Sequence, residues 1–299
     1  MSPEKPNEDR MSPTPRISIG VPVYNGEQHL EEALNALINQ TFTDFEIIIS
    51  DNCSTDSTEH ICREFELRDS RIRYVRQSKN EGALANFVFV LKEAQADHFM
   101  WAAHDDVFDK DWIDSLLPLS IKNNCIAFGQ VQTIDEKGRK TFHVANNRDL
   151  SFRGPRLLRR LRYATDPGFL GKANPVYGVF PTAALTKEAL TAFGTNDMEG
   201  DVMMMFYLLD RYEIMSISGT HLFKRQSPAA GPMPSAAKPK RQSMRDRTML
   251  DGFLRYSRGH ENILLRLLYP FTLLRYRIAN LHLRRLARRK ITNAGRLVP

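Results

Sequence analysis

The sequence predicts an α/β fold in which a mostly parallel sheet is covered by helices. Two observations lead to this prediction. Short apolar runs alternate with segments of helical periodicity from Arg16 to about Gln132, and strands that alternate with helices of this length form βαβ units. The chain has 299 residues, of which 42% are apolar and 26% charged. This composition is typical of a globular protein with one large domain and an appendage.

Four strands and three helices are expected in the first third of the chain. The strands are expected at residues 17–23, 46–50, 72–75 and 98–102. The first helix is expected because apolar residues recur with helical spacing, at Leu30, Ala33, Leu34, Leu37 and Ile38. The motif Asp56-Ser57-Thr58-Glu59 resembles a capping box and predicts the start of the second helix. A similar apolar stripe over residues 84–91 predicts the third.

The rest of the chain is less regular. Glycines and prolines interrupt residues 133–197, helices are expected at 187–193 and 201–212, and a strand at 213–217. The expected organisation is a disordered leader (1–15), one domain over 16–227 with parts 16–132 and 133–227, a linker (228–242) and a basic helical tail (243–299).

Composition restricts the possible classes of protein. The three cysteines form no CxxC pair, which favours a reducing compartment over a disulfide framework. No run of about 18 apolar residues is present, so no spanning helix is expected. The net charge of +7 is unevenly distributed: from Arg241 onward 14 Lys and Arg face three acids, a net of +11, which leaves −4 for the first 240 residues.

Acidic residues follow two of the expected strands. Asp51 lies in a polar turn after the second strand, and Asp105 and Asp106 follow the fourth. The carboxyl ends of parallel strands are where an open α/β sheet binds ligands, and carboxylates bind Mg²⁺ or Mn²⁺, which in turn bridge phosphates. The pattern therefore predicts a nucleotide held through a metal. Turn and cap residues are the alternative interpretation of each acid.

Other nucleotide-binding signatures are absent from the sequence. No GxGxxG follows the first strand and there is no Walker A motif, so neither a dinucleotide site nor a P-loop is supported. No GxSxG elbow indicates nucleophilic catalysis. Gly82, in the turn Asn80-Glu81-Gly82 before the third helix, could let backbone N–H groups approach a ligand.

Four segments, in this order and spacing, resemble glycosyltransferase family 2. They are Val21-Pro22-Val23-Tyr24-Asn25-Gly26, Ser50-Asp51-Asn52-Cys53-Ser54-Thr55-Asp56, Asn80-Glu81-Gly82 and residues 101–106. The resemblance covers about residues 16–226. It implies an inverting enzyme of the GT-A fold, with 16–132 as the nucleotide-sugar half and 133–227 as the acceptor half. It also implies a nucleoside-diphosphate sugar donor and a divalent metal.

The resemblance assigns roles to individual residues. The expected nucleotide-binding residues are Pro22, Tyr24, Asn25, Asp51, Asn52, Ser54, Asn80, Gly82, His104 and Asp105, with Asp51 against the base. Asp105 falls on the metal-binding acid of the family's DxD motif, and Asp106 is a second candidate ligand. Ala103 replaces the first acid of that motif, so the ribose and metal contacts are expected to differ.

The resemblance also locates a catalytic base. Asp201 is the first candidate and Glu199 the second, because Glu199-Gly200-Asp201 lies where the family places this carboxylate, at the start of a helix. Such a carboxylate removes the proton of the acceptor hydroxyl. The alternative interpretation is two acids favoured by the helix dipole. Gln226 stands where many relatives have a histidine that can reach the metal.

The tail has the pattern of a basic amphipathic helix, which suits an anionic membrane surface. Its apolar residues recur at three- and four-residue steps from Leu264 to Leu281, and Pro270 is expected to kink or interrupt the helix. The alternative is a helix packed on the domain. Nucleic acid is not an expected partner, because few aromatic residues lie among the charges.

Together these observations predict a cytoplasmic glycosyltransferase, peripheral on the inner face of the membrane, that serves cell-envelope polysaccharide assembly. Its acceptor would be a glycan or a lipid-linked sugar. Two alternatives remain open: a sugar-1-phosphate nucleotidyltransferase, although Tyr24-Asn25-Gly26-Glu27 is neither glycine-rich nor basic, and a non-catalytic nucleotide-sugar-binding protein, favoured by Ala103 and Gln226.

Overall fold

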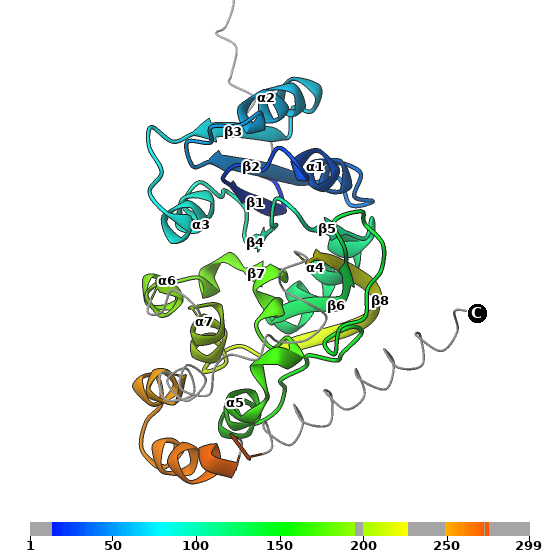
Figure 1. The fold of residues 1–299 in the computed structure, drawn as a ribbon. Helices are drawn as coiled ribbons and strands as arrows, with labels where there is room; N and C mark the ends of the chain where they lie inside the picture. Colours follow the sequence, from blue (N-terminus) through cyan, green and yellow to red (C-terminus); the bar gives the residue numbers. More distant parts are fainter. Residues whose placement is uncertain (1–13, 195–199, 227–248, 272, 275–299) are drawn as a thin grey trace, which may run out of the picture.

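The computed structural model describes residues 14–194, 200–226, 249–271 and 273–274. Its centre is a five-stranded sheet in the order β3-β2-β1-β4-β7 (Figure 1). The strands are β1 (Ile17–Val23), β2 (Phe45–Asp51), β3 (Ile72–Arg76), β4 (His98–Trp101) and β7 (Phe180–Pro181). The first four are parallel and β7 is antiparallel to β4. The predicted α/β fold with a mostly parallel sheet between helices is confirmed.

Helices connect the strands and cover the sheet. They are α1 (Leu30–Ile38), α2 (Thr58–Arg68), α3 (Ala83–Lys92), α4 (Trp112–Asn123), α5 (Arg156–Thr165), α6 (Lys187–Gly194) and α7 (Gly200–Leu208). Helices α1 and α2 contact each other, and α3 packs on β1 and β2. The chain adds strands in one direction from β1 to β3 and then returns to place β4 on the other side of β1. Because the crossovers between parallel strands are right-handed, α3 covers the opposite face of the sheet from α1 and α2.

A second, three-stranded sheet extends the fold beyond β4. It has the order β5-β8-β6, with β5 (Val107–Phe108), β6 (Ile126–Ile134) and β8 (Ile214–Arg225). Short 3₁₀ turns η1 (Gly168–Leu170), η2 (Asn174–Tyr177) and η3 (Thr182–Ala184) lie between α5 and α6. The loosely patterned residues therefore form short ordered elements.

The core lies between the central sheet and its helices. Every residue of β1 is buried, and so are six of the seven residues of β2, as expected for parallel strands covered on both faces. Trp101, at the end of β4, is fully buried among Phe87, Phe99, Phe180 and Phe193. This aromatic cluster fixes the end of β4 directly before the acidic segment.

The strand predicted at residues 213–217 is too short. Strand β8 continues to Arg225 because it pairs with both β6 and β5, and Gly219, at φ +102°, lies within it. The Phe223-Lys224-Arg225 segment is thus held in a sheet. This strand contains polar residues such as Thr220 and His221, so it does not form a continuous apolar run in the sequence.

The capping box predicted at Asp56 does not form: the N-cap of α2 is Ser57, and its side chain makes no capping hydrogen bond. The Asp56 carboxylate accepts a hydrogen bond from the Thr58 backbone N–H at 3.0 Å, but Glu59 turns outward to Arg63 and Arg76 instead of back to the helix start. The two arginines are stronger partners for a carboxylate than a single amide.

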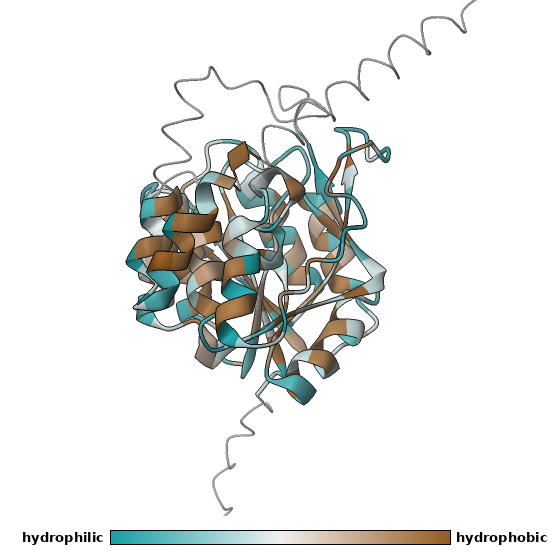
Figure 2. Cartoon of the chain, turned by 90° about the horizontal axis from the view of Figure 1, so that it is seen from below, coloured by the Kyte–Doolittle hydropathy of each residue, from teal (hydrophilic) through white to brown (hydrophobic). Residues whose placement is uncertain are grey.

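The first part of the tail packs on the domain. Residues 249–255 and 260–271 are helical, and Phe253, Leu265 and Tyr269 are buried. The second of these helices continues through Pro270 to residue 271, so Pro270 does not interrupt it as predicted. Seen from below, these helices carry long hydrophobic stretches (Figure 2). The leader up to residue 13, the linker and the last 25 residues lie outside the described residues.

No helix in the described ranges has both the length and the apolar character needed to cross a bilayer.

Candidate functional site

The loops after β1 and β2 are bound together at the carboxyl edge of the sheet. The backbone N–H groups of Asn25, Gly26 and Glu27 donate to side-chain oxygens of Ser54, Thr58 and Asp56, at 2.9, 2.8 and 3.1 Å. Asn25 has a φ of +50°, a conformation that asparagine tolerates better than most residues. The predicted nucleotide-binding residues Asn25 and Ser54 are thus in direct contact.

Asp51 is completely buried at this edge. Its Oδ1 accepts a hydrogen bond from the Ser54 N–H at 2.8 Å, and its Oδ2 accepts one from the Tyr74 hydroxyl at 2.9 Å. Burial and this hydrogen bond raise the pKa of Tyr74, so the phenol remains a donor. Asp51 therefore shapes the loop around it, and its contact with a base stays a prediction.

Two asparagines fix the loop before α3. The Asn52 side chain donates to Asn80 Oδ1 at 2.9 Å and accepts from the Glu81 N–H at 2.9 Å. Asn80 Oδ1 also accepts from the Gly82 N–H. Gly82 has a φ of +86°, which only glycine adopts readily. The amides at the start of α3 are therefore held in a defined position.

His104 packs against the first loop. A Cβ added to Gly26 would lie 2.9 Å from His104 Cδ2 and 2.6 Å from Val23 Cγ2, so this position has room only for glycine. Burial lowers the pKa of His104, which favours the neutral imidazole. Pro22 is buried in β1, whereas Tyr24 is 45% exposed and can reach a ligand.

The acidic pair after β4 is held by Arg225. The Asp106 carboxylate accepts from the Arg225 backbone N–H at 2.8 Å, and the guanidinium Nε donates to the Asp105 carbonyl at 3.0 Å. The same guanidinium binds the carbonyls of Asp135 and Glu136 and the Glu32 carboxylate. Burial raises the pKa of Asp106 to about 6. Arg225 is therefore fully occupied in supporting this loop.

Lys224 brings a positive charge to the same place. Its Nζ lies 3.4 Å from Asn174 Oδ1 and 4.8 Å from the centre of the Tyr177 ring. Burial opposes the charge, but Tyr177 and the carboxylates of Asp106, Asp201 and Asp105 raise the pKa of Lys224. No described carboxylate is within ion-pair distance of this ammonium group.

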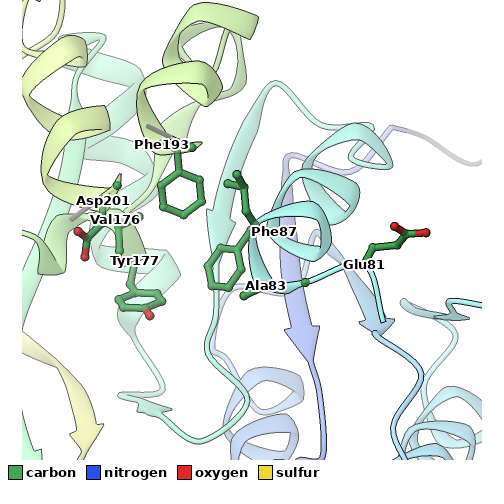
Figure 3. A pocket seen from close by; sticks show the side chains of 11 residues that line it. Glu81, Ala83, Phe87, Val176, Tyr177, Phe193 and Asp201 are labelled. Carbon is green, nitrogen blue, oxygen red and sulfur yellow. The ribbon is translucent and has the colours of Figure 1, made fainter. Parts of the chain in front are cut away.

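The predicted base Asp201 opens α7 and faces a cavity of about 510 Å³. Glu81 and the start of α3 form one side of it, and Tyr177 and Asp201 form the other (Figure 3). Phe87 and Phe193, with ring centres 5.7 Å apart, form its apolar part. Burial raises the pKa of Asp201. The second candidate, Glu199, lies outside the described residues.

Asp105 and Asp106 are the residues that could hold a metal together with a phosphate ligand. In the described part of the chain no group of three or more His, Cys, Asp or Glu side chains could hold a metal ion. Asp105 and Asp106 supply two adjacent carboxylates. Magnesium is commonly bound through one or two carboxylates together with substrate phosphates.

Sequence reasoning missed Tyr74 and Asn174, and it did not connect Tyr177 with Lys224. Tyr74 is contributed by β3 and binds Asp51, and η2 contributes Asn174 and Tyr177, which contact Lys224. No local motif marks these residues, because each acts through a partner more than 20 positions away. The pairing of β3 with β2 is the signal that could have indicated Tyr74.

Comparison with known proteins assigns this fold and site to a family. The family described as Glycosyl transferase family 2 matches residues 18–189, and the chain belongs to it. Glycosyltransferase GlyA of Streptococcus pneumoniae is 31% identical over 131 residues, which are 43% of this chain and 19% of GlyA. TuaG of Bacillus subtilis, named for teichuronic acid biosynthesis, is 31% identical over 37% of this chain and 44% of its own length. The chain thus spans less than half of either relative.

Solved structures share the fold over most of the chain. S. aureus TarS 1–349 in complex with UDP-GlcNAc has a TM-score of 0.59 at 19% identity, covering 84% of this chain and 70% of that one. The mannosyltransferase PcManGT of Pyrobaculum calidifontis, in complex with GDP-Man and Mn²⁺, has a TM-score of 0.52 at 15% identity, covering 90% and 74%. At these identities the similarity supports the fold.

Proposed function

We propose that the protein transfers a sugar, with inversion, from a nucleoside-diphosphate sugar to a glycan or lipid-linked acceptor. One observation carries this proposal: the acidic pair Asp105-Asp106 is held by the backbone beside Lys224, and Lys224 contacts Tyr177, which together with Asp201 lines a cavity large enough for a sugar. A nucleotide-sugar site needs acids for a metal, a cation for a diphosphate and a base for the acceptor. Family membership supports the same conclusion.

The proposed chemistry is a single displacement. The acceptor oxygen attacks the anomeric carbon as the bond from that carbon to the diphosphate oxygen breaks, and Asp201 takes the hydroxyl proton. Lys224 neutralises the negative charge that develops on the departing diphosphate. A bound Mn²⁺ or Mg²⁺, held by Asp105 and Asp106, would supply Lewis-acid stabilisation of the same oxygens. Phe87 and Phe193 give the cavity an apolar wall.

Nucleotide binding tests the proposal. We expect UDP, GDP or dTDP, tested with Mn²⁺, to raise the melting temperature, because binding to the folded state stabilises it. Asp105→Ala should abolish the metal-dependent part of the shift. Lys224→Met should lower donor hydrolysis by about 10²–10³-fold, the usual effect of removing one charge-stabilising group. Lys122→Met, an exposed lysine of α4, is the matched control.

The outcomes separate the possible functions. No shift with any of the three nucleotides, together with an unchanged Asp105→Ala variant, would overturn the proposal. Binding of a nucleotide sugar without hydrolysis in the wild-type protein would instead indicate a non-catalytic binding protein.

The proposed setting is polysaccharide assembly at the inner face of the cell membrane. The sequence similarity to TuaG, which is named for teichuronic acid biosynthesis, supports a role in polysaccharide assembly. The tail supports the location, because Ile263, Leu267, Phe271 and Leu274 recur on one helix face and are 56–70% exposed, and basic residues follow them in the sequence. We expect the protein to sediment with vesicles that contain anionic lipid, and Leu267→Asp/Phe271→Asp to weaken that binding. Unchanged sedimentation of this variant would contradict the proposed location.

A further inference from the structure

A second cavity lies at the C-terminal end of α7, the end farther from Asp201. It has a volume of about 270 Å³ and is bounded by α5, the residues after α7 and the segment around residues 255–258. Its lining contains five arginines and one acid, Asp210. We refer to it as the arginine pocket: Arg156, Arg160, Arg211, Arg255 and Arg258.

Two of the five arginines build the pocket walls. Arg160 is fully buried and donates to Glu261 Oε1 at 2.6 Å and to the Phe206 carbonyl at 2.7 Å. Arg156 forms an ion pair with Asp210 at 2.5 Å. These contacts tie α5 to α7 and to the first part of the tail, so the pocket is a fixed feature of the domain.

The other three arginines have no such structural role. Arg211, Arg255 and Arg258 are exposed, and no carboxylate in the described ranges forms an ion pair with them. Arginines often occur near helix ends because they compensate the free carbonyl groups there.

Here those carbonyl groups already have partners. Arg159 donates to the carbonyls of Leu209 and Asp210 after α7, and Arg160 to those of Phe206 and Tyr256. The three exposed guanidinium groups are therefore in excess of what the helix ends require.

We propose that the arginine pocket binds a phosphate or diphosphate ester. Guanidinium groups match phosphate oxygens with two parallel hydrogen bonds, which makes arginine the preferred residue for this chemistry. Three tyrosines of the lining add hydroxyl donors, and two of them, Tyr207 and Tyr256, contact each other edge to face at 5.7 Å. The ligand is thus a phosphorylated compound with a sugar or similar group that packs on the tyrosine rings.

The position of the pocket indicates the acceptor rather than the donor, and this step rests on the proposed function. From Asp201 to Leu208, where α7 ends, the helix advances by about 10 Å, at about 1.5 Å per residue, and Asp210 lies in the turn beyond it. The donor diphosphate is expected at the sheet edge near Asp105, so it does not occupy the far end of α7. A phosphate separated by a few sugars from the hydroxyl that attacks would span this distance.

Binding of inorganic pyrophosphate tests the pocket without any turnover. We expect Arg211→Gln/Arg255→Gln/Arg258→Gln to weaken pyrophosphate binding to the full-length protein at least tenfold, measured by calorimetry at low salt without divalent metal. The matched control is Arg68→Gln/Lys122→Gln/Arg162→Gln, which removes three exposed charges elsewhere. An equal loss in both variants, or no loss in the pocket variant, would overturn the proposal.

Two further measurements identify the source of the phosphate and separate this proposal from the transfer reaction. Weaker binding of the pocket variant to phosphatidic acid vesicles, relative to the control variant, assigns the site to a lipid headgroup. Loss of pyrophosphate binding alone assigns it to a soluble phosphate ester. Donor hydrolysis should be retained in the pocket variant. If the wild-type protein hydrolyses no donor but the pocket variant still loses pyrophosphate binding, the transfer function fails and the phosphate site stands.

Discussion

Lys224 and Asp201 are two half-buried ionisable groups: Asp201 lines the cavity, and Lys224 contacts Tyr177, which also lines it. Burial alone would favour the neutral form of each group. Tyr177 and the nearby carboxylates, Asp106 and Asp201 among them, oppose this cost at Lys224 and raise its pKa. Such an arrangement keeps charge available beside the cavity. It also means that the site is less stable than it would be with neutral side chains.

We predict that Asp201→Asn stabilises the folded protein at pH 7.5. Because burial raises the pKa of Asp201, the folded state binds a proton that the unfolded state has released at pH values between the ordinary and raised pKa. Stability therefore falls as pH rises through this window and stays low above it. The asparagine avoids this cost, so its melting temperature should exceed that of the wild type at pH 7.5. The gain should disappear below about pH 4. A lower melting temperature at pH 7.5 would contradict the account.

At the scale of elements, β8 connects the two halves of the site. It extends along β6 and β5 and ends at Lys224, which contacts the cavity residue Tyr177, and Arg225, which supports the acidic loop. The Asp105 and Asp106 segment is thus positioned by a strand more than 100 residues later in the chain.

We predict that Arg225→Met destabilises the protein by at least about 1.5–3 kcal/mol, because several carbonyls and a carboxylate lose a charged donor. Arg73→Met is the matched control, since Arg73 forms a half-exposed ion pair with Glu93. That change should cost less than about 1 kcal/mol. Equal effects in denaturant unfolding would show that Arg225 does not support the loop.

The sequence indicates the first half of the fold because its signals are local. Apolar runs at residues 17–23 and 46–50 predict β1 and β2 nearly to the residue, and the acids after the second and fourth strands predict the binding edge. Strand β8 is recognised only in part, since polar residues such as Thr220 and His221 interrupt its apolar pattern. The partners Tyr74, Tyr177 and Asn174 come from tertiary pairing, which a single sequence does not encode in any short pattern.

At the scale of the whole molecule, the first part of the tail belongs to the folded domain. Phe253 packs on Phe206 of α7, with ring centres 4.7 Å apart, and Glu261 binds Arg160 of α5. One side of the tail helix is therefore buried against the domain while the other exposes apolar side chains. The structure thus shows the alternative interpretation, packing on the domain, for this part of the tail, and membrane binding stays a proposal.

We predict that Leu265→Ala lowers the free energy of unfolding by about 2–5 kcal/mol, as expected for a fully buried leucine. Leu267→Ala, two positions away and 60% exposed, should change it by no more than about 0.5 kcal/mol. Chemical denaturation of both variants measures the difference. If the two substitutions have the same small effect, the tail does not pack as described.

The most direct test of the transfer site is single-turnover hydrolysis of nucleotide sugars by the wild type and Asp201→Asn, after a binding screen has identified the donor. The account predicts that the variant binds the donor within threefold of the wild type and hydrolyses it at least about 100-fold more slowly, the usual contribution of a general base. Hydrolysis by Asp201→Asn at the wild-type rate would contradict the assignment of this carboxylate and of the cavity that it faces.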